Sequence, residues 1–410
     1  MKRTIDDLAV TGRRVLVRLD LNVPLDDSQR ITDDRRIREA LPTLKKLLDG
    51  GGRLILMSHL GRPEGGPDDR LKHSLAPVAK RLGELLGRPV RMLPDCVGAE
   101  VTAAVAALKD REVCLLQNLR FHEEETIADK KARERPELAK RKRAFAEALS
   151  ALGDAYVNDA FGTCHRDNAS MLTVPQRMAG KPRVVGYLVQ KELKFLGQAI
   201  ANPARPFVCA LGGAKVSDKL NVIRSLLNKC DTILIGGAMA YTFLVADGLA
   251  VGKSRIEPEL FDTARGLKTE ANDRLRLPLD SVAAREIAEG VASQVCESSI
   301  PPDQMGLDIG PKTIEAYKRV LDGARTIFWN GPMGVFEVPP FDRGTLAIAR
   351  ALAEATTRGA TTIVGGGDSA AAVDKAGLAD RMTHISTGGG ASLEFLEGKP
   401  FAALEVLDDA

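Results

Sequence analysis

The decisive stretch of the chain reads Pro206-Phe207-Val208-Cys209-Ala210-Leu211-Gly212-Gly213-Ala214-Lys215-Val216-Ser217-Asp218-Lys219-Leu220. An apolar run long enough for a buried strand is followed by two glycines and by a helix-compatible segment with two lysines. A strand that turns on glycines into a helix presents free N–H groups and the positive end of the helix dipole, where phosphate binds. The stretch matches neither Gly-x-x-x-x-Gly-Lys-Ser/Thr nor Gly-x-Gly-x-x-Gly. A phosphate site and an ordinary turn with two solvated lysines therefore both remain open here.

The length and composition of the chain indicate a globular protein of two domains. It has 410 residues, with 44% hydrophobic and 28% charged residues. The net charge is only +3, so any basic site must be a local cluster. Aromatic residues make up 4% of the chain, which argues against a stacking platform for bases. We therefore expect no nucleic-acid partner.

The six cysteines include no Cys-x-x-Cys pair, and most lie in apolar runs. This pattern indicates small buried residues in a reducing compartment, not a disulfide framework or a zinc site. No N-terminal signal segment and no apolar run of ~20 residues is recognisable. We expect a cytoplasmic protein with no membrane partner.

The first half of the chain alternates two kinds of segment. Short apolar runs that end in polar residues occupy 14–24, 53–63, 113–122 and 155–166. Helix-like segments occupy 37–48, 75–86, 101–108 and 144–152. The alternation predicts an α/β fold on a parallel sheet, whose ligand crevice lies beyond the carboxyl ends of the strands.

Polar and basic residues follow these strands: Asp20, Asn22, His59, Arg62, Arg120, His122, His165 and Arg166, with Arg36 at the start of the first helix. Any one arginine fits a solvated surface, but four such sets at one edge favour an anionic ligand. The run 129–143 has eight basic and three acidic residues, and only Leu138 is apolar enough for burial. We interpret that run as a solvated face without chemistry. Residues 175–182 lose periodicity and indicate the end of a domain, and 188–200 reads as a connecting helix.

The second half repeats the strand-turn pattern with glycines at the turns. Apolar runs end at Gly212-Gly213, Gly236-Gly237, Asn330-Gly331, Gly365-Gly366-Gly367 and Gly388-Gly389-Gly390. One such pair is weak evidence, but five predict an edge of backbone N–H groups that phosphorylated ligands approach closely. Asp368 directly follows a glycine triplet, so it is either a metal ligand or a helix N-cap. A small anion on one domain and a nucleotide on the other would give phosphoryl transfer.

The chain resembles the phosphoglycerate kinase family from about Val15 to Gly398. The resemblance rests on long segments with little use elsewhere: 18–24, 58–63, 118–122, 158–166, 211–219, 236–243, 329–337, 365–368 and 386–396. It implies two Rossmann-like, doubly wound domains joined by a helix hinge. Residues 1–186 would bind 3-phosphoglycerate, with a tail of residues 391–410 packing back on them. Residues 187–390 would bind the nucleotide, beginning with a connecting helix at 188–201.

The resemblance also implies the site residues. Those for 3-phosphoglycerate are Asp20, Asn22, Arg36, His59, Leu60, Gly61, Arg62, Arg120 and Arg166. Those for the nucleotide are Gly212, Lys215, Lys219, Gly236, Gly237, Asn330, Glu337, Gly366, Gly367, Asp368 and Ser369. The transferred phosphate would meet Thr387, Gly388 and Gly389, and the catalytic groups would be Arg36, Lys215, Gly367 and Gly390. Three positions depart from the family pattern: Gln117, Ala238 and Asn168.

The implied reaction is the reversible transfer of a phosphoryl group between 1,3-bisphosphoglycerate and ADP, which gives 3-phosphoglycerate and ATP. The acceptor carboxylate is already ionised at neutral pH, so no general base is needed. Asp368 would hold Mg²⁺ with the nucleotide, Lys219 its phosphates and Glu337 its ribose. Each substrate belongs to a different domain, so a hinge closure is expected, and a monomer is the family's usual state.

Two other functions compete with this interpretation. An NAD-dependent dehydrogenase would suit two doubly wound domains, but the chain lacks Gly-x-Gly-x-x-Gly and has an arginine-rich edge instead. A non-catalytic binding protein would keep the fold as a scaffold. The presence of Arg36, Lys215 and Asp368 weighs against that second alternative.

Overall fold

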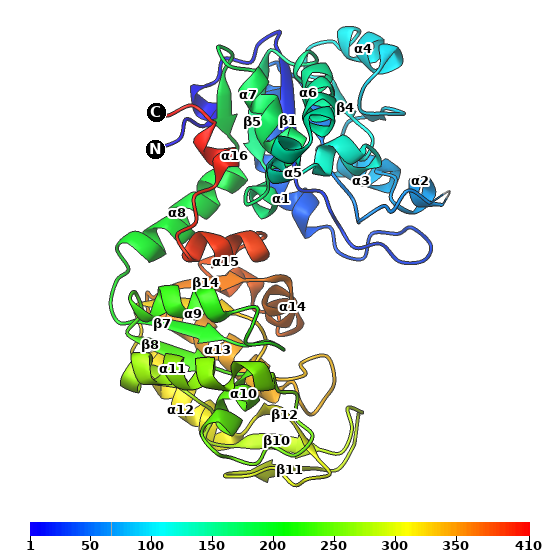
Figure 1. Cartoon of the computed structure of the whole chain (residues 1–410). Helices are drawn as coiled ribbons and strands as arrows, with labels where there is room; N and C mark the ends of the chain where they lie inside the picture. The colour runs from blue at the N-terminus through cyan, green and yellow to red at the C-terminus, as the bar shows by residue number, and fades with distance from the viewer. Residues whose placement is uncertain (67) are drawn as a thin grey trace. The chain divides into compact units, whose positions relative to one another are not determined.

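The computed structural model describes residues 1–66 and 68–410, and of residues 198–200 only the backbone. The chain divides into two compact units (Figure 1). Unit 1 comprises Met1–Leu193 and Pro400–Ala410, and unit 2 comprises Lys194–Lys399. The boundary lies inside helix α8 (Tyr187–Ala201), later than the position expected from the sequence.

Unit 1 is built on a six-stranded sheet in the order β3-β4-β2-β1-β5-β6. The strands are β1 (Arg14–Leu19), β2 (Arg53–Met57), β3 (Val90–Met92), β4 (Val113–Leu115), β5 (Ala155–Asp159) and β6 (Arg183–Val185). All neighbouring pairs are parallel, with Val15 opposite Leu54 and Ala155 in the central strands. Their carboxyl ends therefore share one edge of the sheet.

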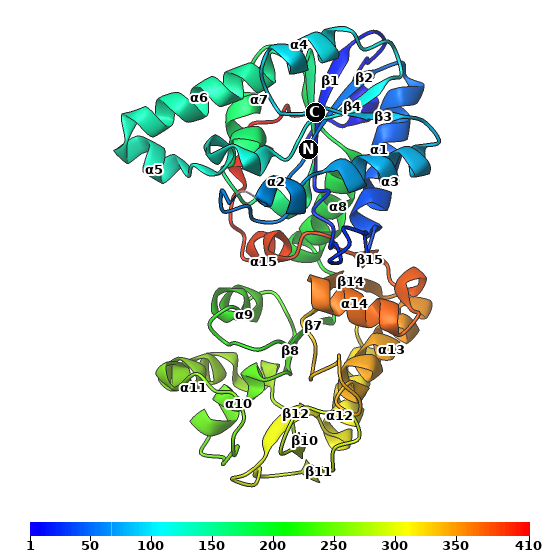
Figure 2. The ribbon, with the colours of Figure 1, turned by 90° about the vertical axis from the view of Figure 1, so that its right-hand side faces the viewer.

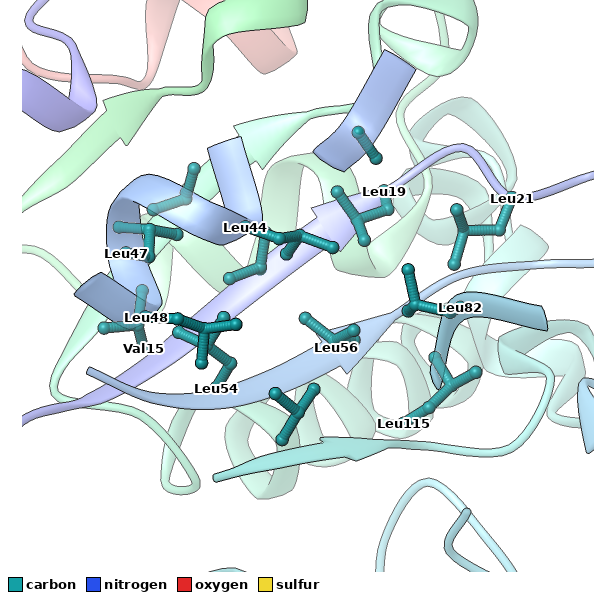
Figure 3. Packing of buried hydrophobic residues seen from close by; sticks show 14 of the residues in the cluster. Val15, Leu19, Leu21, Leu44, Leu47, Leu48, Leu54, Leu56, Leu82 and Leu115 are labelled. Carbon is teal, nitrogen blue, oxygen red and sulfur yellow. The ribbon is translucent and has the colours of Figure 1, made fainter. Parts of the chain in front are cut away.

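Helices cover both faces of this sheet (Figure 2). They are α1 (Arg35–Asp49), α2 (Asp69–Lys72), α3 (Ala76–Leu86), α4 (Ala99–Ala106), α5 (Asp129–Glu134), α6 (Pro136–Ser150), α7 (Val174–Arg177) and α16 (Ala402–Glu405). Helix α1 turns Leu44, Leu47 and Leu48 toward Val15 and Leu54 of the central strands (Figure 3). These leucines recur at helical spacing, which is why the segment forms a helix with one apolar face.

The end of the chain completes unit 1. Arg183 in β6 pairs with Asp408 at 2.8 Å, and Lys2 pairs with Asp409 at 3.0 Å. Residues 391–399, which we had expected to belong to this tail, are part of unit 2. The reason is local, since Ser225 and Lys229 of unit 2 both donate to the carbonyl of Leu396.

Unit 2 is built on a second six-stranded parallel sheet, in the order β15-β14-β13-β7-β8-β9. The strands are β7 (Phe207–Leu211), β8 (Thr232–Ile235), β9 (Leu275–Arg276), β13 (Thr326–Asn330), β14 (Thr361–Gly365) and β15 (His384–Ile385). The helices are α9 (Leu220–Leu227), α10 (Met239–Ala246), α11 (Phe261–Ala271), α12 (Pro311–Asp322), α13 (Arg343–Thr357), α14 (Gly367–Lys375) and α15 (Gly390–Leu396). Figure 2 shows helices on both sides of the sheet, so the predicted fold class is confirmed.

Three features differ from what the sequence predicted. A separate antiparallel sheet, β11-β10-β12, was missed; its strands are β10 (Ser281–Ala284), β11 (Ser293–Cys296) and β12 (Met305–Ile309). Residues 175–182 do not end the domain, because the chain returns to the sheet as β6. The basic run 129–143 is not a uniformly solvated face, because Lys142 is buried among three oxygen acceptors while Leu138 is only partly buried.

Candidate functional site

The carboxyl ends of the unit 1 strands form what we call the basic edge. It consists of Asp20 and Asn22 after β1, Arg36 on α1, His59 to Arg62 after β2, Arg120 after β4 and Arg166 after β5. The parallel strands bring these residues from separate parts of the chain to one edge.

Asp20 and Arg36 form an ion pair at the basic edge. Arg36 Nη1 lies 2.6 Å from Asp20 Oδ2, and the carboxyl side chain is almost fully buried. Burial by itself raises the pKa of Asp20, but Arg36 and the neighbouring positive groups outweigh burial and hold the pKa below its usual value. Asp20 therefore stays ionised and fixes the position of the Arg36 guanidinium.

His59 is a neutral donor in this arrangement. Arg18 Nη2 lies 3.2 Å from His59 Nδ1, and an arginine nitrogen can only donate, so Nδ1 accepts and the ring proton sits on Nε2. Burial and the nearby arginines lower the pKa of His59 well below its usual value, despite the opposing effect of Asp20. His59 thus offers a hydrogen bond without a charge.

Arg18 was not among the site residues expected from the sequence. It is buried one residue before the carboxyl end of β1, and its Nε donates to Ser170 Oγ at 2.9 Å. Ser170 in turn donates to the buried carboxylate of Glu125 at 2.6 Å. An arginine inside the apolar run Val15-Leu16-Val17-Arg18-Leu19 was the available signal, since a buried charge requires partners.

Among the described residues, one N–H donor of Arg120 has no hydrogen-bond acceptor. Its Nη1 donates to the carbonyl of Gly61 at 2.6 Å. Within the described part of the chain its buried Nε has no partner. Burial, with Arg166 and Arg18 nearby, lowers the pKa of Arg120 to about 10. Arginines held this close to one another, with an unused donor, favour an anionic ligand.

The loop after β2 is fixed by two asparagines. Asn22 Oδ1 accepts from the N–H of Gly61 at 2.8 Å, and Asn118 bonds both the N–H and the carbonyl of Leu60. The backbone of the buried Leu60 is thus held by Asn118. Asn22, Leu60 and Gly61 line a hollow of about 350 Å³, while Arg62 and Arg166 are exposed.

The carboxyl ends of the unit 2 strands form what we call the glycine edge. Its residues are Gly212, Lys215, Lys219, Gly236, Gly237, Asn330, Glu337, Gly366 to Ser369 and Thr387 to Gly390. The sequence predicted that all five glycine turns offer free N–H groups. That prediction is wrong for the first two turns, and it fails in part in two others, where the N–H of Gly331 donates to Ser369 Oγ and that of Gly388 donates to Ser386 Oγ. The N–H groups of Gly212, Gly213, Gly236 and Gly237 donate to backbone carbonyls of Asn330, Pro332, Leu211 and Met333.

Close backbone packing explains these glycines. A Cβ on Gly212 would lie 2.0 Å from the carbonyl oxygen of Pro332, and one on Gly237 would lie 2.5 Å from the nitrogen of Gly213. Gly213 also has φ +122, a conformation that side chains rarely permit. The turns after β7, β8 and β13 therefore lie directly against one another because they lack side chains.

The helix expected directly after Gly213 begins only at Leu220. In between, Glu257 accepts from the N–H groups of Val216 and Ser217, at 2.5 and 3.1 Å, and from Ser217 Oγ. Glu257 was missed by sequence reasoning because it is 40 residues from Ser217 along the chain. Lys215, between these features, is exposed and close enough to Glu257 to lower the pKa of that carboxyl group.

Lys219 is held differently from Lys215. It is buried, its Nζ donates to Oδ1 of Asn330, and Asp368 is an electrostatic neighbour. Burial lowers the pKa of Lys219 to about 8, against the opposing effects of Asp218 and Asp368. Lys219, Asn330 and Asp368 are thus brought together from β13 and from the starts of α9 and α14.

Two helices of the glycine edge begin at glycines. Gly366, with φ +90, precedes α14, and Gly389, with φ +50, precedes α15. The first N–H groups of a helix have no partner inside it, so both ends suit an anion. Ser369 Oγ accepts from the N–H of Gly331 at 2.6 Å and is buried, so it holds the loop instead of facing solvent. Asp368 and Glu337 are exposed.

The comparisons with known proteins decide the family. The phosphoglycerate kinase family model matches residues 5–399. The chain belongs to the phosphoglycerate kinase family. A phosphoglycerate kinase of Rhodopirellula baltica is 54% identical over 412 residues, and one of Chlorobium phaeobacteroides is 53% identical; each alignment covers 100% of both chains. The solved phosphoglycerate kinase of Coxiella burnetii has a TM-score of 0.83 and 37% identity, covering 99% of this chain and 98% of that one. The chain is therefore a kinase of this family.

Of the three departures from the phosphoglycerate kinase pattern, Gln117 has hydrogen bonds that hold neighbouring backbone. Gln117 accepts from the N–H groups of Leu75 and Asn118, at 3.0 and 2.9 Å. Ala238 precedes α10, and the buried Asn168 precedes the short helix at Ala169–Thr173.

Among the described residues, no helix has the length and apolar character needed to cross a membrane.

Proposed function

We propose that the chain catalyses the reversible reaction of 1,3-bisphosphoglycerate with ADP to give 3-phosphoglycerate and ATP. The observation that carries the proposal is the crowding of Arg18, Arg36 and Arg120 near the Asp20 carboxylate, with Arg166 close to Arg120. In the part of the chain that the structure describes, the buried Nε of Arg120 has no acceptor. A small, multiply charged acid would neutralise these groups. Membership of the kinase family supplies the phosphoryl chemistry.

In the direction that consumes ATP, a carboxylate oxygen of 3-phosphoglycerate forms a bond to the γ-phosphorus as the bond to the bridging oxygen of ADP breaks. The nucleophile is already ionised, so the enzyme needs no base. Its task is to position two anions and to balance the charge on the transferred group. We assign Arg36 to this group from the acid side and Lys215 from the nucleotide side. The N–H groups at Gly367, Gly389 and Gly390 would add oxyanion-type donors, whereas the N–H of Gly388 donates to Ser386 Oγ at 3.1 Å.

The nucleotide would bind at the glycine edge. Lys219 and the start of α14 would hold its phosphates, and Glu337 its ribose. Asp368 fits a role in holding Mg²⁺, because this ion is usually bound by one or two carboxylates together with substrate phosphates, and the Asp368 carboxylate is exposed beside Lys219. When bound, Mg²⁺ supplies positive charge to the nucleotide phosphates.

The two edges belong to different units, so the reaction requires them to meet. We propose that binding of both substrates closes the chain about residues near α8 and excludes water from the acyl phosphate. Small-angle scattering tests this closure. The radius of gyration should fall only when both ligands are present, and an unchanged value with both ligands would refute the closure.

An assay of ATP-dependent consumption of 3-phosphoglycerate tests the function itself. Activity with this pair of substrates is expected. Change of nicotinamide absorbance instead would favour a dehydrogenase, and binding without turnover would favour a scaffold protein. The finer assignments to Mg²⁺, to a monomer and to the cytoplasm are part of the proposal.

A further inference from the structure

A cluster of nitrogen, sulfur and oxygen ligands lies in unit 1 apart from the residues assigned to phosphoryl transfer. Asp95 and Cys96 follow β3, and His122 lies between Arg120 and the short helix Glu123–Thr126. One ligand atom of each, the Asp95 carboxylate oxygen, the Cys96 sulfur and a His122 ring nitrogen, lies within 4.8 Å of the other two. His122 is distant from Cys96 along the chain, and the sequence contains no Cys-x-x-Cys pair. The three residues are therefore recognisable as a cluster only in the folded structure.

We propose that Asp95, Cys96 and His122 bind a zinc-class divalent cation. Thiolate, imidazole and carboxylate are the ligands that Zn²⁺ takes in proteins, with bonds of about 2.0–2.3 Å and tetrahedral geometry. Three protein ligands leave a fourth position for water, and the side chains of Asp95 and His122 are 37% and 21% exposed, so solvent reaches the cluster. The fully buried Cys96 forms its inner wall.

The three side chains already contact protein groups. His122 Nε2 lies 2.6 Å from Asp95 Oδ1, and Cys96 Sγ donates to the carbonyl of Gln117 at 2.8 Å. Tetrahedral ligands at these bond lengths stand roughly 3.3–3.8 Å apart, so Asp95 and His122 must separate by about 1 Å. The ring of Phe145 stacks on His122 with centroids 4.9 Å apart, which keeps the imidazole oriented during this shift.

Binding exchanges a proton for the metal. Cys96 Sγ donates to the carbonyl of Gln117, so the thiol carries its proton before the metal binds. The cation forms its bond to sulfur as the S–H proton leaves for the buffer.

Titration of the whole chain with Zn²⁺ alone, followed by calorimetry under reducing conditions, tests the site. One equivalent should bind, with proton release. Co²⁺ in place of Zn²⁺ should give a thiolate-to-cobalt charge-transfer band. Cys96→Ser should abolish this band and weaken Zn²⁺ binding at least ~10-fold, and His122→Gln should weaken binding by a similar factor.

Cys114→Ser is the matched control, because Cys114 is another buried thiol of unit 1, in β4. It should bind both metals as the unmodified chain does. The proposal fails if the unmodified chain binds no Zn²⁺, or if Cys96→Ser keeps the band or the affinity. Circular dichroism identifies a variant that has not folded, and the partly exposed His122 provides a second, milder variant in that case.

Discussion

Arg36 on α1 and Asp20 after β1 form an ion pair of 2.6 Å at the basic edge, and Asp20 is ionised there. Arg36 is thereby oriented before any ligand arrives. Arg36→Lys keeps the charge but loses the planar guanidinium that recognises an anion through two parallel hydrogen bonds. We expect kcat to fall about 10²-fold with a smaller change in the Kd of 3-phosphoglycerate. Arg38→Lys, on the same helix but paired with Asp34, is the control and should leave both unchanged.

Lys215 should act on the phosphoryl group in transit. Lys215→Ala is expected to lower kcat by ~10³ while leaving the Kd of the nucleotide nearly unchanged, since a charge that acts mainly on the transition state affects kcat. Single-turnover rates and equilibrium titration measure the two quantities. Lys312→Ala, at an exposed position on α12, should change neither. A loss confined to KM would contradict the transfer role.

Lys219 should make kcat/KM for the nucleotide sensitive to alkaline pH. Its pKa is lowered to about 8 by burial, so the free enzyme loses this positive charge as the pH rises through 8. We expect kcat/KM for the nucleotide to fall above pH 8, because this parameter reports groups of the free enzyme. Lys219→Arg should move the fall to higher pH. An identical profile in the variant would show that another group titrates.

His59 should make the fold less stable in weak acid. Its pKa is lowered well below the usual value of 6.5, so the folded state keeps it neutral while the unfolded state takes up a proton below that pH. Stability is therefore lost as the pH falls from 6.5, by about 1 kcal/mol at pH 5.5. Urea unfolding followed by circular dichroism at both pH values measures this loss. His59→Gln should lose less stability over the same interval, and equal losses would refute the assignment.

Lys142 should contribute to the stability of unit 1. Its buried Nζ donates to the carbonyls of Ile127 and Asp167 and lies 2.6 Å from Asp129 Oδ1. Lys142→Met leaves these acceptors without a donor. We expect the free energy of unfolding to fall by about 2 kcal/mol or more. Lys140→Met, two residues earlier and exposed, should change the free energy of unfolding by less than about 0.5 kcal/mol. Equal effects of the two changes would contradict the structural role.

The basic edge was largely predictable from the sequence. Each basic residue except Arg36 follows an apolar run, and parallel strands bring the ends of such runs to one edge. Arg18 was missed because it lies inside a run, where only its partners Ser170 and His59 explain it. The glycine edge was predicted in position but not in detail, because Gly-Gly pairs that pack against backbone and those that offer free N–H groups look the same in a sequence.

The sequence by itself determined the alternation of strand and helix, the two parallel sheets and the family, because apolar periodicity and turn residues act over a few neighbouring positions. Only the tertiary structure decided which donors and charges remain available. Glu257 accepts hydrogen bonds from the N–H groups of Val216 and Ser217, which are 41 and 40 residues away along the chain. Asn330 accepts a hydrogen bond from Lys219, 111 residues away. These pairs form because buried polar groups in the folded state require hydrogen-bond partners. The partners come from distant parts of the chain, so no local sequence pattern specifies them.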